Sequence, residues 1–141
     1  MTIDLINNLL SDIANFHFVI FGIALSLFTV LFSFILNKRE ELRGYSERIK
    51  LGEESISLFQ KNQAAKNFIK KLKRVNFHII IIIFISLIMY VLVWIVKNFL
   101  INNFNKLYLF YILSALSILI FIYVFSIIIK VILDYNRLTK I

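Results

Sequence analysis

Three long runs of apolar residues, separated by polar segments, dominate the sequence. They cover residues 18–36, 79–96 and 107–129, and none of them contains a charged residue. A helix of about 20 apolar residues crosses a hydrocarbon layer about 30 Å thick. Inside lipid a backbone must satisfy its own hydrogen bonds, which a helix does within one segment. The pattern therefore predicts an all-α integral membrane protein with three transmembrane helices.

Charge is concentrated between the first two runs. The segment 37–76 holds eleven basic and five acidic residues, whereas the connection 97–106 holds only two lysines. The first fifteen residues contain two acids and no basic side chain. Because loops rich in Lys and Arg stay on the cytoplasmic side, we expect the N-terminus outside and the C-terminus inside. The expected location is the bacterial inner (plasma) membrane.

The expected segments follow from these two patterns. In chain order they are an amphipathic outer interfacial helix over 1–15, a first span over 16–37, a basic cytoplasmic helical segment over 38–75, a second span over 76–97, an outer loop over 98–106, a third span over 107–133 and a cytoplasmic tail over 134–141. The first segment alternates apolar and polar side chains at helical spacing, as interfacial helices do. A helix that runs out of the membrane without a break is the open alternative.

The basic segment repeats apolar residues at three- and four-residue spacing, which predicts two helices that bury one side. Gly52 interrupts the pattern and Ser55 is a suitable N-cap, so we expect a helical hairpin that breaks between Leu51 and Ser55. The residues expected to face inward are Leu42, Tyr45, Ile49, Ile56, Phe59, Ala65, Phe68, Ile69, Leu72 and Val75.

The basic side chains favour contact with membrane lipids or with an acidic cytoplasmic protein partner. Nucleic acid is not an expected partner, because no stacking aromatic residues interleave with the basic ones. Near the end of the third span, Lys130 is expected to reach the inner headgroups and to pair with Asp134. The candidate contacts with lipid or a partner protein are Lys70, Lys71, Lys73, Arg74 and Lys130.

Small and hydroxyl-bearing residues form a stripe along the first span. The small-residue stripe consists of Gly22, Ser26, Thr29 and Ser33. Such stripes let helices pack closely. If copies of this helix surround an axis, the same residues line a pore, with Phe28 or Phe32 as a constriction. Three helices alone cannot enclose a polar path, so the sequence favours a homo-oligomer and leaves pore lining and helix packing open.

Catalytic chemistry is not expected. The chain has no cysteine, and its two histidines, His17 and His78, belong to opposite ends of the spans. The three apolar runs contain no acid, and no metalloprotease, nucleophile-elbow or phosphate-loop motif is present. We therefore expect no catalytic, cofactor or metal site, and a protein that is not an enzyme.

The order of spans and charged segments along the chain resembles that of a known group of proteins, and this adds an expectation about function. From about residue 23 to 139 the chain resembles the small multi-span membrane proteins of bacterial anti-phage systems, such as RexB-like phage-exclusion proteins. Shared features are an apolar span ending in a basic turn (SFILNKREEL, residues 33–42), a charged internal segment, two further spans and a short charged tail. The resemblance implies an effector that permeabilises or depolarises the inner membrane when a partner senses infection, and it assigns no functional residues.

Two hypotheses follow. The first is a small oligomeric effector that conducts ions or perturbs the membrane in antiviral defence, with an ion channel along the small-residue stripe. The alternative is a non-conducting membrane anchor or accessory subunit that recruits a soluble partner through the basic cytoplasmic segment.

Overall fold

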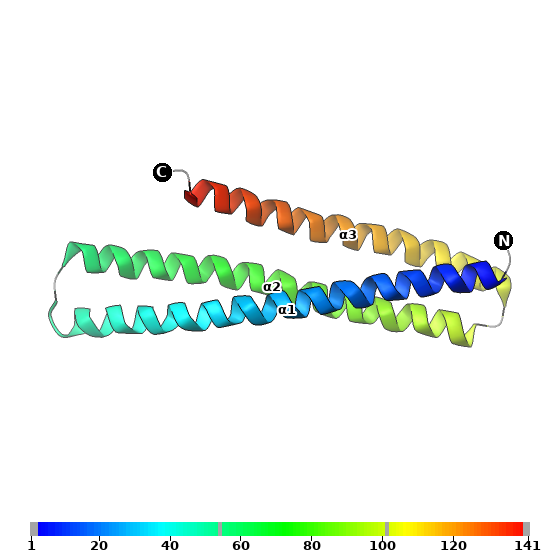
Figure 1. The fold of residues 1–141 in the computed structure, drawn as a ribbon, viewed down its shortest axis with the longest axis horizontal. Helices are drawn as coiled ribbons and strands as arrows, with labels where there is room; N and C mark the ends of the chain where they lie inside the picture. The colour runs from blue at the N-terminus through cyan, green and yellow to red at the C-terminus, as the bar shows by residue number, and fades with distance from the viewer. Residues whose placement is uncertain (1–2, 54, 101, 140–141) are drawn as a thin grey trace. The chain divides into compact units, whose positions relative to one another are not determined.

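The computed structural model describes residues 3–53, 55–100 and 102–139. These residues form three helices and no strand: α1 (Ile3–Lys50), α2 (Ile56–Phe99) and α3 (Asn103–Thr139) (Figure 1). Each helix contains a stretch long and apolar enough to cross a membrane, with mean hydropathies of 2.6, 3.2 and 2.8. The predicted all-α class with three helices of spanning length is confirmed, whereas the orientation stays a prediction.

The first two helices are much longer than a membrane crossing requires. α1 has 48 residues and α2 has 44, so at about 1.5 Å per residue each far exceeds a hydrocarbon layer about 30 Å thick. Residues 3–15 thus belong to the same helix as the expected first span. Their position relative to the membrane surface stays a prediction.

The break between α1 and α2 falls at the predicted place and has a specific hydrogen-bonding pattern. Gly52 has φ of 87°, a left-handed conformation that costs glycine little because it has no Cβ. The Gly52 N–H donates to the Ile49 carbonyl at 3.1 Å, and the Glu53 N–H donates to the Arg48 carbonyl at 3.2 Å. These two bonds satisfy carbonyls that a helix end leaves without donors. α2 then begins after Ser55, whose carbonyl accepts from the Phe59 N–H at 3.2 Å.

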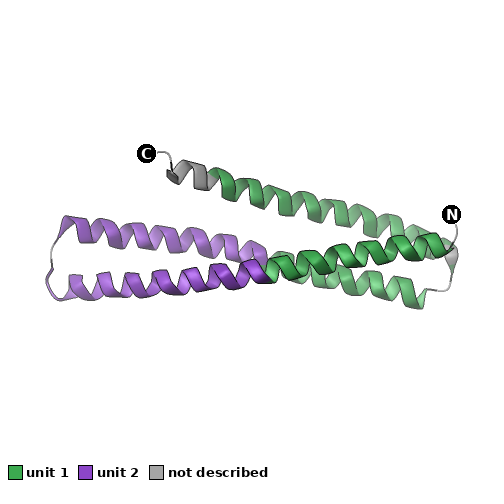
Figure 2. Ribbon diagram, viewed as in Figure 1, with its two compact units in different colours: residues 1–25, 80–141 green, residues 26–79 purple. Residues whose placement is uncertain are grey.

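The chain divides into two compact units, and α1 and α2 each contribute to both. Unit 1 comprises residues 1–25 and 80–141, and unit 2 comprises residues 26–79 (Figure 2). In unit 1, Asn7 of α1 contacts Lys106 of α3, and His17 contacts Ser117. The contact positions advance together along both helices, so α1 and α3 run in the same direction there.

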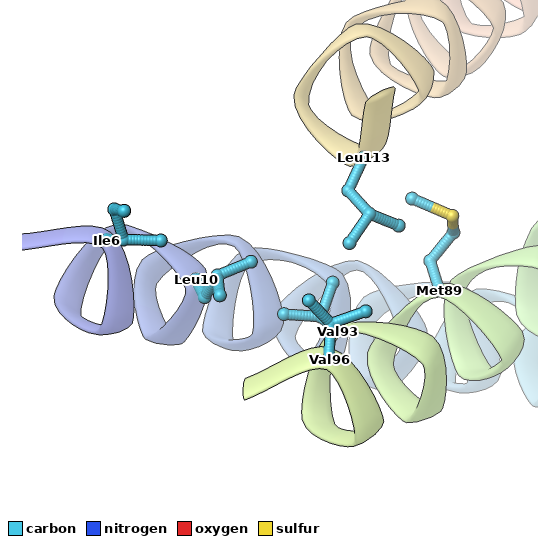
Figure 3. Packing of buried hydrophobic residues seen from close by; sticks show 6 residues of the cluster. All are labelled: Ile6, Leu10, Met89, Val93, Val96 and Leu113. Carbon is cyan, nitrogen blue, oxygen red and sulfur yellow. The ribbon is translucent and has the colours of Figure 1, made fainter. Parts of the chain in front are cut away.

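A cluster of buried apolar residues from all three helices forms the core of unit 1 (Figure 3). Its members are Ile6, Leu10, Met89, Val93, Val96 and Leu113. Leu10 and Val93 have no exposed surface. Because lipid tails are as apolar as these side chains, close packing holds such a cluster within a membrane more than the hydrophobic effect does. Within residues 3–15, Ile6 and Leu10 are therefore buried by helix packing, whereas Ile3 and Leu5 are exposed.

Unit 2 is a helical hairpin formed by the second half of α1 and the first half of α2 (Figure 2). The buried side of α2 follows positions 58, 62, 65, 69, 72, 76 and 79 at alternating spacings of four and three. Leu58, Ala65 and Ile69 are buried on this side. Positions 62 and 76 are asparagines. They interrupt the apolar pattern that is used to assign the buried side of a helix from its sequence.

Three residues expected to face inward do not do so. Ile56, Phe59 and Phe68 are 80%, 51% and 40% exposed, whereas Leu58 is 4% exposed. Successive residues of a helix are separated by about 100° around its axis, so burial of Leu58 turns Phe59 away from α1. The prediction was wrong because it followed the aromatic side chains and passed over the asparagine positions.

Candidate functional site

The small-residue stripe lies on an exposed face of α1. All four of its residues are exposed, and no atom beyond the backbone of α1 lies within 4 Å of the place where a Cβ on Gly22 would stand. The Ser33 Oγ donates to the Thr29 carbonyl at 3.1 Å. The rings of Phe28 and Phe32 stack with centroids 5.9 Å apart, but at about 100° per residue they point roughly 130° and 90° around α1 from the centre of the stripe. This face is open to a neighbouring molecule, and its role in packing or pore lining stays a prediction.

Two lysines tie the three helices together at one end of unit 1. Lys106 is only 4% exposed, and its Nζ donates to Asn7 Oδ1 at 2.9 Å and to the Lys97 carbonyl at 2.8 Å. The Lys97 Nζ donates to Ser11 Oγ at 2.7 Å. The Lys97 carbonyl belongs to the last turn of α2, where carbonyls lack helical donors and a cation is favoured by the helix dipole. The sequence alone assigns these lysines only to a short connection.

A buried histidine joins α1 to α3 further along unit 1. His17 has no exposed surface, and its Nε2 lies 2.8 Å from Ser117 Oγ. The Ser117 hydroxyl also donates to the Leu113 carbonyl at 2.8 Å, and the tautomer of His17 decides which atom donates in the contact between the two side chains. Among the described residues, His17 Nδ1 and the buried Ser86 Oγ have no hydrogen-bond partner. The apolar sequence around His17 and Ser117 gives no signal of this contact.

The α1 half of the basic segment balances its own charges. Residues 38–54 contain five basic and five acidic side chains. Three ion pairs form within this stretch: Lys38 with Glu41, Arg43 with Glu47, and Arg48 with Glu53. Arg48 donates to both carboxylate oxygens of Glu53, at 2.5 and 2.6 Å. This hydrogen bonding lowers the pKa of Glu53 below its ordinary value and raises the pKa of Arg48.

The α2 half carries six basic side chains and no acid between residues 56 and 79. These six are Lys61, Lys66, Lys70, Lys71, Lys73 and Arg74. All of them are exposed, and within the described ranges none of their side chains forms an ion pair or hydrogen bond. Residues 38–54 and residues 56–79 of one hairpin therefore differ by six charges. The predicted lipid or partner contacts at residues 70–74 lie within this uncompensated set.

The remaining predicted positions give less information. Lys130 is exposed on α3. The side chain of its expected partner Asp134 lies outside the described set, as do the side chains of residues 135–141. Within the described residues, no group of three or more His, Cys, Asp or Glu side chains could hold a metal ion.

Comparison with known proteins gave no match: no family model, curated protein or solved structure matches this chain.

Proposed function

We propose that this chain forms a homo-oligomer in the bacterial inner membrane and acts as an effector that conducts ions or perturbs the membrane, in defence against phage. The observation that carries the proposal is the exposed small-residue stripe on α1. Every one of its four positions is exposed although α1 buries other residues, such as Ala24 and Ile35.

Lipid and a second protein helix differ in the contacts that they make with such a face. Small residues give lipid chains little contact area, whereas a second helix can approach them closely and exchange hydrogen bonds with their hydroxyl groups. A ring of copies that brings Ser26, Thr29 and Ser33 to its axis presents their hydroxyls to water and ions. Closed rings are a common way for identical subunits to bury one face each.

The first experiment measures membrane potential with a voltage-sensitive dye in cells that express the intact chain. Ser26→Trp and Thr29→Trp place a large ring on the stripe, and we expect depolarisation to change in both variants at equal membrane abundance. Leu27→Trp is the matched control, because Leu27 is also exposed on α1 but points about 100° away from Ser26. Equal depolarisation in all three variants, or none in the parent chain with its genomic neighbours present and triggered, would contradict the proposal.

The second experiment tests assembly directly. Since the chain has no cysteine, a single Ser26→Cys substitution gives every copy one thiol on the stripe. Oxidation in the membrane should join two copies if stripes face each other near an axis, because a disulfide requires Cβ atoms about 4 Å apart. Leu27→Cys should remain monomeric on a non-reducing gel. Equal crosslinking at both positions would show random collision instead of a defined interface.

A non-conducting anchor or accessory subunit is the second candidate. The observation that favours it is the uncompensated charge of the α2 half of the basic segment, which a chain acting only through its spans does not need.

A further inference from the structure

The outer side of the α2 half of the hairpin presents a regular row of exposed residues. Phe59, Gln63, Lys66, Lys70 and Lys73 follow one another at spacings of four, three, four and three, and all are exposed. We call these five residues the outer face. The buried side of α2 is set by Leu58, Ala65 and Ile69, and the outer face lies about 100° around the helix axis from that side. A row with this spacing matches the contact row of a second helix.

The membrane that holds the chain does not account for this whole row. At about 1.5 Å per residue, Lys66 lies about 15 Å and Phe59 about 26 Å along α2 from Asn76, where the second span is expected to begin. Attraction by anionic headgroups decays over a Debye length of about 8 Å. α2 contains no Pro or Gly, the residues at which helices usually kink sharply. Headgroups therefore suit Lys73 and Arg74, whereas Lys66 is at the limit of their reach and Phe59 is beyond it.

Exposed apolar side chains gather at the turn of the hairpin. Leu51 is 86%, Ile56 is 80% and Phe59 is 51% exposed, in a segment whose charges keep it out of the hydrocarbon. Apolar surface left in water favours burial against another protein at about 25 cal/mol per Å². The turn end of α2 is apolar and is followed by a row of lysines. A partner that fits this surface therefore combines apolar side chains with negatively charged ones.

We propose that the outer face docks an acidic amphipathic helix of a soluble protein. Its Asp or Glu side chains pair with Lys66, Lys70 and Lys73, and its apolar side chains cover Phe59 and Ile56. Charge complementarity selects this occupant, because residues 38–54 have no net charge and residues 56–79 carry six positive charges and no acid. The docking site suits either a conducting effector that needs a sensor or an anchor, so it does not depend on conduction.

The test places a photo-crosslinking amino acid at Gln63 in the full chain, in cells that contain its natural neighbours. Glu40, which is exposed on the α1 half, takes the same crosslinker as a control. We expect one soluble protein to be joined at Gln63 and not at Glu40, and peptide mapping to place the contact in a segment with acidic residues three or four positions apart. Crosslinks to lipid, to a second copy, to a non-acidic segment or to nothing would overturn the proposal.

Charge neutralisation then separates docking from other effects. The triple variant Lys66→Gln, Lys70→Gln, Lys73→Gln should lower crosslinking about tenfold, the equivalent of three exposed charge pairs of about 0.5 kcal/mol each. The matched variant Lys38→Gln, Arg43→Gln, Lys50→Gln removes three cations from the balanced half and should leave crosslinking unchanged. An equal loss of crosslinking in both variants would show that binding is not specific to the outer face and would overturn the proposal.

Lipid is tested with the purified full chain in nanodiscs of phosphatidylcholine or phosphatidylglycerol. We expect amide exchange over residues 56–66 to be the same in both. Slower exchange in phosphatidylglycerol would assign the face to the membrane. Because these readouts are crosslinking and amide exchange, failure of the docking site is distinguishable from failure of the membrane-potential experiment.

Discussion

Lys106 of unit 1 and a set of lysines in unit 2 have opposite surroundings. In unit 1, Lys106 is almost fully buried and donates to oxygens from α1 and α2. In unit 2, Lys66, Lys70 and Lys73 are exposed and pair with no described residue. An ammonium group satisfied by oxygens of neighbouring helices stabilises the fold, whereas one without a partner leaves its charge for another molecule. The comparison predicts that the stability of the fold depends on the buried Lys106 and that binding of another molecule depends on the exposed lysines of unit 2.

The largest effect on stability is expected from Lys106→Met. Methionine has a similar length but cannot donate, so Asn7 Oδ1 and the Lys97 carbonyl each lose a charged donor. Hydrogen bonds to charged groups contribute about 1.5–3 kcal/mol, and we expect the free energy of unfolding to fall by about 2 kcal/mol. Reversible unfolding of the purified chain in micelles, followed by circular dichroism, measures this.

The control is the outer-face triple variant to glutamine. Exposed substitutions away from packed contacts change stability by less than about 0.5 kcal/mol, so its unfolding curve should overlay that of the parent chain. If the triple variant destabilises as much as Lys106→Met, the contrast between the two sets of lysines is wrong.

A smaller loss is expected from Ser117→Ala. This change leaves the buried His17 Nε2 without its hydrogen-bond partner on α3, and polar contacts between membrane helices contribute about 1 kcal/mol. Ser126→Ala is the matched control, since Ser126 is exposed and its Oγ donates to the Ile122 carbonyl of the same helix. Unfolding in micelles should separate the two variants, and equal curves would show that the contact between His17 and Ser117 contributes nothing to stability.

The smallest effect concerns the exposed pair of Arg48 and Glu53. Because the pKa of Glu53 in the folded chain lies below its ordinary value of 4.5, the pair's stabilisation is fully present above about pH 4.5 and is lost as pH falls through the folded pKa. Amide exchange at Gly52 and Glu53 should therefore quicken, relative to the intrinsic rate, between pH 6 and pH 3. Arg48→Gln should remove this pH dependence, and salt should weaken it. An unchanged profile in Arg48→Gln would contradict the assignment.

The sequence was sufficient for the features that composition and local geometry determine. Uncharged runs about 20 residues long could cross lipid only as helices, so the three helices were predictable. The break was also predictable, because Gly52 suits a left-handed conformation and Ser55 suits a helix start. Both signals act within a few residues of the feature that they specify.

Contacts between distant residues were not predictable in the same way. The buried side of α2 includes Asn62 and Asn76, so hydrophobicity pointed instead to Phe59, which is exposed. The α1 partner of Lys106 and the α3 partner of His17 lie 99 and 100 residues away in the sequence, and the periodicity within one helix carries no information about them. The uncompensated charge of residues 61–74 became evident only when the ion pairs of the neighbouring half were known.

The parallel course of α1 and α3 in unit 1 has a consequence for biosynthesis. The two halves of unit 2 are separated by a five-residue turn, so this hairpin can close as soon as residue 79 has left the ribosome. Unit 1 must wait for α3, because Asn7 and His17 find their partners only at Lys106 and Ser117. Synthesis at about 5–20 residues per second separates the two events by seconds. During that interval the N-terminal part of α1 can already bond to α2 through Ser11 and Lys97, but Asn7 and His17 still lack their partners on α3.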